Sequence, residues 1–200
     1  MNIGLYFGTY NPIHVGHLII ANYMVDYTEL DQVWLVVSPQ NPFKSKASLL
    51  ADYHRIALAN IAIEGNNKLK ASNIEFDLPK PSYTIDTLVY IQEKYSEHTF
   101  SLIMGEDNLR TFHKWKNHEQ ILENYSIHVY PRVVTNNEKS KNSNDSPIKN
   151  HPKITLHKDA PVMKVSASFI RKAIKEKKNV QYLLSEPVFK YVKEMHFYEK

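Results

Sequence analysis

The chain has 200 residues, 42% hydrophobic and 23% charged, which suits one globular domain over residues 1–200 and is short for two. It has no cysteine, no apolar run long enough to cross a bilayer and no signal-peptide pattern at its start, which excludes disulfides and thiol chemistry and predicts a cytoplasmic protein without membrane contact. The net charge of +4 fits either a protein that binds nucleic acid or an enzyme whose substrates are polyanions. The excess lysines are expected to lie on the solvated surface, so we expect no nucleic-acid partner.

Short apolar runs alternate with longer amphipathic ones along the chain. The predicted strands are Ile3–Phe7, Val33–Ser38, Lys68–Ile74, Thr99–Met104, Ser126–Tyr130 and Ile154–His157. The predicted helices are Leu18–Tyr27, Ser48–Ile63, Ile85–Tyr95, Asn108–Glu123, Ser166–Lys177 and Pro187–Met195. This alternation predicts an α/β fold, a Rossmann-like doubly wound parallel sheet of about six strands with helices on both faces. In such a sheet the ligand binds beyond the carboxyl ends of the strands.

A turn with two histidines, Gly8–His17, follows the first predicted strand. His14 and His17 are three residues apart, a spacing that places two side chains on one face of a helix. The start of a helix also offers free backbone N–H groups and the positive end of the helix dipole. The sequence therefore predicts an anion site that carries two imidazoles, and a polyphosphate is its most natural ligand. The alternative is that the two histidines only cap the helix or lie on the surface.

A second anion site is predicted at the start of the helix that follows residue 165. Ser166 is a good N-cap residue, and Ser168 and Arg171 share a helical face near the positive end of the helix dipole. A hydroxyl and a guanidinium in this arrangement can hold phosphate oxygens. The alternative is a capped helix with a surface arginine.

The region from residue 135 to 153 is rich in Asn, Ser, Lys and Asp and has no aromatic residue. It cannot bury enough apolar area to offset the entropy of ordering it, so we expect a mobile surface loop within one domain. The segment after residue 190 is aromatic and is expected to dock as a helix.

Four stretches resemble the signature segments of the nicotinate-nucleotide adenylyltransferases, one family among the HxGH nucleotidyltransferases. They are Thr9-x-Asn11-Pro12-x-His14-x-Gly16-His17, Pro81–Leu88, Gly105-Glu106-Asp107 with Trp115, and Ser166-x-Ser168-x-Ile170-Arg171. They follow the family's order and cover nearly the full length. The HxGH motif alone would be less specific, because class I tRNA synthetases have a similar one.

The resemblance implies an enzyme of NAD biosynthesis that transfers the adenylyl group of ATP to nicotinate mononucleotide, giving deamido-NAD and pyrophosphate without a covalent intermediate. It implies Mg²⁺ held mainly by the ATP phosphates, with no metal site of protein ligands. The catalytic residues would be His14, His17 and Arg171. The ATP site would comprise Gly8, Thr9, Asn11, His14, Gly16, His17, Lys44, Arg132, Ser166, Ser168 and Arg171.

The resemblance also implies a site for nicotinate mononucleotide. Its residues would be Ser82, Tyr83, Thr84, Gly105, Asp107 and Trp115, with the indole stacked on the pyridine ring. Lys116 stands where the family often has tyrosine, and Phe43 stands before Lys44 where it commonly has histidine. Without the resemblance, Ser82 and Thr84 are candidates to cap a helix. Arg55 resembles an arginine of the family, but it could equally be a surface charge.

Three other functions fit parts of the sequence. Phosphopantetheine adenylyltransferases share the motif, but they are shorter and lack the Ser82–Leu88 and Trp115 stretches. Nicotinamide mononucleotide is a second possible acceptor, although we expect the acid to be preferred. A non-catalytic nucleotide sensor or an RNA-binding module of the synthetase type would use the basic loop, yet the chain has no second lysine-rich motif of the KMSKS kind.

Overall fold

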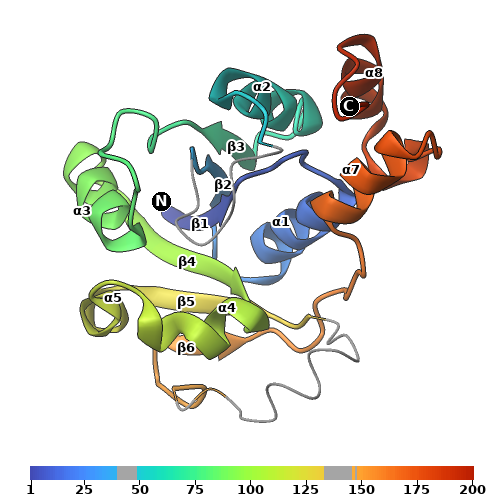
Figure 1. The fold of residues 1–200 in the computed structure, drawn as a ribbon. Coiled ribbons are helices and arrows are strands. Elements are labelled where there is room, and N and C mark those ends of the chain that lie inside the picture. The colour runs from blue at the N-terminus through green and yellow to red at the C-terminus, as the bar shows by residue number, and fades with distance from the viewer. Residues whose placement is uncertain (40–48, 133–145, 147) are drawn as a thin grey trace.

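A six-stranded parallel sheet forms the centre of the molecule in the computed structural model, which describes residues 1–39, 49–132, 146 and 148–200 (Figure 1). The strands lie in the order β3-β2-β1-β4-β5-β6, and each pairs in parallel with its neighbours. Their bounds are β1 Asn2–Gly8, β2 Gln32–Val37, β3 Leu69–Ser72, β4 Thr99–Gly105, β5 Ser126–Tyr130 and β6 Ile154–Leu156. From β1 the chain adds β2 and β3 on one side of the sheet and then adds β4, β5 and β6 on the other side. This change of side between β1 and β4 confirms the predicted doubly wound fold.

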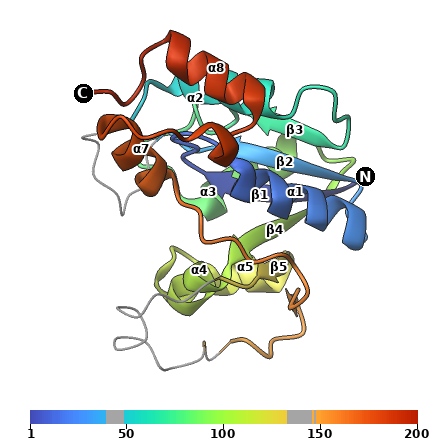
Figure 2. The ribbon, with the colours of Figure 1, turned by 90° about the vertical axis from the view of Figure 1, so that its right-hand side faces the viewer.

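Helices cover both faces of the sheet (Figures 1 and 2). One face packs against α1 (Val15–Tyr27), α2 (Asp52–Ala62), α7 (Ala167–Lys175) and α8 (Glu186–Glu194), together with the 3₁₀ turn η2 (Gln181–Leu183). The other packs against α3 (Thr84–Lys94), α4 (Glu106–Thr111) and α5 (His118–Asn124), with the 3₁₀ turn η1 (Phe112–Lys114). Among the described residues no helix combines the length and the apolar character needed to cross a membrane.

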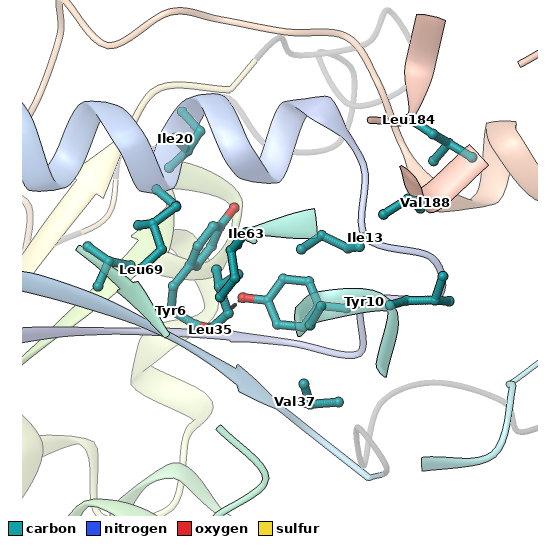
Figure 3. Packing of buried hydrophobic residues seen from close by; sticks show 14 of the residues in the cluster. Tyr6, Tyr10, Ile13, Ile20, Leu35, Val37, Ile63, Leu69, Leu184 and Val188 are labelled. Atoms are coloured by element: carbon teal, nitrogen blue, oxygen red, sulfur yellow. Dashed lines mark hydrogen bonds between the residues drawn. The ribbon is translucent and has the colours of Figure 1, made fainter. Parts of the chain in front are cut away.

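The alternation of side chains along each strand divides the core into two clusters. In β2, Val33, Leu35 and Val37 join the cluster under α1 and α2, while Trp34 and Val36 join the cluster under α3. Successive residues of a strand point to opposite faces, so a strand that is apolar throughout must be covered on both sides. Figure 3 shows the first cluster, in which Leu184 and Val188 of the C-terminal region lie close to the turn after β1. The C-terminal segment therefore docks on the core as predicted, but only its first part is helical, because α8 ends at Glu194 and Phe197 is buried after it.

The predicted helix Asn108–Glu123 is wrong, because the structure breaks it into α4, η1 and α5. Trp115 is extended (φ −75°, ψ 144°), and Asn117 takes a left-handed conformation (φ 50°) that stops a continuous helix. Asparagine tolerates this conformation better than most residues. The buried residues are Leu109 and Phe112 before the break and Ile121 and Leu122 after it. Phe112 and Ile121 are nine residues apart, about two and a half helical turns, so one uninterrupted helix could not place both on the same face.

Several further boundaries differ from those predicted, among them the start of α1, which is at Val15 and not at Leu18. The strand predicted to reach Ile74 ends at Ser72, and Ile74 is buried in the loop that follows. The helix predicted from Ser48 begins at Asp52, so residues 49–51 precede it. Most of the predicted mobile loop, 135–153, lies outside the described residues. Within it, Ser146 is buried, and its hydroxyl donates to the carbonyl of Leu109 at 3.1 Å.

Candidate active site

A cavity of about 310 Å³ opens at the carboxyl ends of β1 and β4, where the strand order reverses. This is the position at which doubly wound sheets bind their ligands. Most of its walls come from four parts of the chain: the end of β1 with the turn after it, the end of β4, residues 130–132, and the segment from Pro161 to α7. Ten of the eleven residues predicted to bind ATP line it: Gly8, Thr9, Asn11, His14, Gly16, His17, Arg132, Ser166, Ser168 and Arg171. The eleventh, Lys44, lies outside the described residues.

The turn after β1 is shaped by a tyrosine that folds back under the strand. Tyr10 has a positive φ of 44°, and its hydroxyl donates to the carbonyl of Tyr6 at 2.5 Å (Figure 3). A Cβ on Gly8 would lie 2.9 Å from the Tyr10 ring, so glycine leaves room for this arrangement. The buried Tyr10 ring thus supports the floor of the cavity from the core side.

The two histidines meet at the start of α1. His14 is its N-cap residue with extended backbone angles (φ −145°, ψ 169°), and His17 is at the third helical position. Their side chains lie on the same side, as predicted, and the rings stack with centroids 3.7 Å apart and planes 23° from parallel. The surface alternative is wrong for His14, which is only 6% exposed, whereas the capping alternative is correct in part, because the two histidines form a capping box. A Cβ on Gly16 would lie 3.1 Å from the His14 ring, so glycine lets that ring lie flat.

A backbone hydrogen bond fixes the proton on His17. The N–H of His14 donates to Nδ1 of His17 at 3.2 Å, so Nδ1 is an acceptor and carries no proton. A neutral imidazole has one donor and one acceptor, so its proton is on Nε2. His17 can therefore offer an N–H to a phosphate oxygen without first becoming charged.

Burial, together with the smaller effect of the nearby positive charge of Arg132, lowers the pKa of His14 to about 4. The unfolded chain, with a pKa near 6.5, then binds more protons than the folded chain as the pH falls below 6.5. The contribution of His14 to stability is thus fully present above that pH and is lost as the pH falls toward 4. We expect the wild type to lose about 2 kcal/mol more unfolding free energy than His14→Gln between pH 7 and pH 5. Urea denaturation of both proteins at the two pH values measures this, and equal losses would contradict it.

The start of α7 brings the second predicted anion site to the first. Ser166 is the N-cap residue, and its hydroxyl accepts from the N–H of Phe169 at 3.2 Å, as predicted. The Arg171 guanidinium donates to the carbonyl of Asn11 at 2.8 Å and to the Ser168 hydroxyl at 3.2 Å. These bonds place a serine hydroxyl and a guanidinium beside the two imidazoles, so one polyphosphate could contact both groups.

Arg132 lies at another wall of the cavity and forms an ion pair with Asp107. Asp107 belongs to the first turn of α4, which follows β4. The pair thus connects the cavity to one end of the predicted nicotinate-nucleotide site. A Cβ on Gly105 would collide with the Asp107 carboxylate and the Tyr130 ring, so no larger residue fits there without a shift.

None of the residues predicted for nicotinate mononucleotide lines the cavity itself. Tyr83 is the N-cap residue of α3 without a side-chain cap bond, so the capping alternative for Ser82 and Thr84 is wrong. Trp115 is half-buried and packs against Phe112. Lys116, next to Trp115, connects this segment to the start of α3. Its Nζ lies 2.9 Å from the Asp86 carboxylate and 4.8 Å from the centre of the Tyr83 ring. The helix-initiating turn and the indole are thus held near each other beside α4.

Arg55 is not a surface charge, because its side chain is 0% exposed. Its five hydrogen bonds run to the Asp52 carboxylate and to four backbone carbonyls, those of Thr9, Ser38, Pro39 and Leu50. A guanidinium has five N–H groups, so all of them are paired. Arg55 therefore ties the turn after β1 to the segment after β2, which sequence reasoning left undecided. The visible signal was Asp52 three residues earlier on the same helix.

Comparisons with known proteins identify the relatives of this chain. Residues 5–173 match the model of the cytidylyltransferase-like family. A probable nicotinate-nucleotide adenylyltransferase of Flavobacterium johnsoniae is 54% identical over all of both chains. The protein of that name from Bacteroides fragilis is 40% identical over 94% of this chain and 89% of its own.

Solved structures share the fold at low sequence identity. The nicotinic acid mononucleotide adenylyltransferase of Plasmodium falciparum, complexed with NaAD, has a TM-score of 0.78 at 19% identity and covers 99% of this chain and 97% of its own. A putative nicotinate-nucleotide adenylyltransferase from Vibrio parahaemolyticus has a TM-score of 0.70 at 19% identity, covering 100% and 96%. With a family model over most of the chain and full-length relatives at this identity, the chain belongs to the nicotinate-nucleotide adenylyltransferase family.

Proposed function

We propose that this chain transfers the adenylyl group of ATP to nicotinate mononucleotide and releases deamido-NAD and pyrophosphate. The observation that carries the proposal is the meeting of His14, His17 and the Ser168–Arg171 pair around one cavity at the switch point of the sheet. Its relatives bear the name of this activity, and a structural neighbour was solved with NaAD.

The chemistry needs positioning and charge stabilisation more than covalent help from the protein. A phosphate oxygen of nicotinate mononucleotide attacks the α-phosphorus of ATP in line, a new P–O bond forms, and the bond to the β-phosphate oxygen breaks. The electron pair of that bond leaves with pyrophosphate. His17 would donate from Nε2 to an oxygen of the reacting phosphate, and Arg171 would hold the departing phosphates. Such contacts become stronger as negative charge builds in the transition state.

The described walls of the cavity include no aspartate or glutamate side chain. We infer that a magnesium ion brought in with ATP would be held by phosphate oxygens and water, not by carboxylates of these walls. Mg²⁺ commonly binds in this way and needs no set of protein carboxylates. The metal would neutralise phosphate charge, while the chain's own cationic and N–H groups would orient the triphosphate.

The acceptor would bind beside the cavity, across the Arg132–Asp107 ion pair. There the Trp115 ring offers a flat face for a pyridine ring, and the start of α3 offers N–H groups to a carboxylate. Lys116 already holds the Trp115 segment to α3 through Asp86. The two substrates would thus approach from opposite sides of one ion pair.

A substrate panel tests the proposed function directly. Purified protein with MgATP is offered nicotinate mononucleotide, nicotinamide mononucleotide and phosphopantetheine, and pyrophosphate release is measured. We expect turnover with the acid, weaker turnover with the amide, and none with phosphopantetheine. Release of pyrophosphate with phosphopantetheine alone, or with none of the three, would overturn the proposal.

A further inference from the structure

We propose that Tyr198, almost at the end of the chain, is a positioning residue of the ATP site that acts through Asn11. This inference rests on the proposed function for its kinetic readout. Tyr198 and Asn11 are 187 positions apart, yet the Tyr198 hydroxyl donates to Oδ1 of Asn11 at 2.8 Å. Asn11 is buried, belongs to the turn between β1 and α1, and lines the cavity.

A reversal of the chain after α8 delivers Tyr198 to this position. The N–H of Phe197 donates to the carbonyl of Val192 at 3.1 Å, and the N–H of His196 donates to that of Lys193 at 3.2 Å. His196 has a left-handed φ of 52°. This pattern is the Schellman motif, which ends a helix and turns the chain back. Its usual apolar contact is available here, because Phe197 and Val192 are buried in the same cluster.

The environment of Tyr198 keeps its hydroxyl a donor. Burial raises the pKa of the phenol far above its ordinary value, although the charges of Arg171 and Arg55 oppose this shift. The hydroxyl therefore stays protonated at any pH at which the enzyme would work. A carboxamide oxygen can only accept, so the direction of the bond to Asn11 is settled.

Asn11 is held on both its side chain and its main chain. Its Oδ1 accepts from Tyr198 and also from the N–H of Leu50, at 3.2 Å, and two donors on one oxygen fix the orientation of the amide. Its carbonyl accepts from Arg171 of α7 at 2.8 Å. Asn11 is thus the point at which the end of the chain, α7 and the segment before α2 all hold the histidine turn. Loss of the Tyr198 bond should loosen that turn relative to the phosphate-binding groups.

The first experiment compares Tyr198→Phe with Tyr182→Phe. Both substitutions remove one hydroxyl in the C-terminal region, but Tyr182 is 87% exposed. We expect Tyr198→Phe to lower kcat/KM for ATP about three- to tenfold, the range that one lost hydrogen bond gives. Tyr182→Phe should leave this ratio unchanged. An unchanged ratio in Tyr198→Phe, or an equal fall in both variants, would overturn the assignment.

A double-mutant cycle with Asn11→Ala separates positioning from a general loss of stability. If Tyr198 acts through Asn11, Tyr198→Phe should cost nothing further in the Asn11→Ala background. If the fold-decreases in kcat/KM caused by the two single substitutions multiply in the double variant, Tyr198 has only a structural role and the proposal fails. ATP affinity of the four proteins, measured by calorimetry, is the parallel readout. A parent protein that binds ATP but does not adenylylate nicotinate mononucleotide would refute the proposed function, and the affinity cycle would still decide the role of Tyr198.

Discussion

His17→Ala is expected to lower turnover with MgATP and nicotinate mononucleotide about a hundredfold or more while the protein stays folded. The variant removes the one imidazole whose proton is fixed on Nε2 by the backbone N–H of His14. That N–H can find water in the opened space, so the cost to folding should be small compared with the cost to catalysis. Steady-state pyrophosphate release measures the effect, with circular dichroism and urea denaturation as checks on folding.

His17→Gln provides the matched comparison. Its amide oxygen can accept from the His14 N–H and its NH₂ group can donate onward, so part of the donor geometry is kept. We expect Gln to recover some of the turnover that Ala loses. Full activity in the alanine variant would remove His17 from the mechanism, and equal activity in both variants would contradict the tautomer argument.

Arg55→Ala is expected to lower the unfolding free energy by about 3–5 kcal/mol. The change leaves four backbone carbonyls without their donor, and among the described residues the Asp52 carboxylate keeps only its contact with Lys80. Unpaired buried acceptors carry the full cost of their lost hydration. Because two of these carbonyls belong to Thr9 and Ser38, activity should fall as well. Urea denaturation followed by circular dichroism gives the first quantity.

The loss of unfolding free energy in Arg55→Ala is compared with the losses in Arg55→Lys and Lys190→Ala. An ammonium has three N–H groups and no planar fork, so lysine should restore only part of the stability. Lys190 pairs with Glu186 at 2.7 Å on the surface of α8, where solvent screens the two charges, so this exposed pair should contribute little to stability. A loss in Arg55→Ala as small as that in Lys190→Ala would show that the buried network does not stabilise the fold.

The sheet was predictable because its signal is local. The β2 strand is apolar at nearly every position, as a strand covered on both faces must be, and glycine and proline mark the turn that follows β1. The single helix predicted across α4, η1 and α5 was wrong, because the backbone angles of Trp115 and Asn117 interrupt it. Periodicity reports which side faces the core and does not report backbone angles.

The residues that line the cavity were predictable from the sequence motifs, whereas the groups that support them were not. Arg55 binds mainly backbone carbonyls, which every residue possesses, so nothing in the sequence names its partners. Tyr198 contacts Asn11 only because the helix before it ends in a left-handed turn. The prediction of the residues for nicotinate mononucleotide rested on the resemblance alone. The contacts of Lys116 with Tyr83 and Asp86 are visible only in the structure.

The central place of β1 has a consequence for the order in which the protein assembles. Its first residues pair with β4 at Thr99, and Arg171 reaches Asn11 across 160 positions of the chain. Contacts so distant in sequence form slowly, because the chain loses the entropy of closing a long loop before these contacts can stabilise it. A ribosome-bound nascent chain that lacks α7 can therefore begin the β1–β2–β3 half of the sheet, but its Asn11 still lacks the contact with Arg171. We expect nucleotide binding to be among the last properties gained during synthesis.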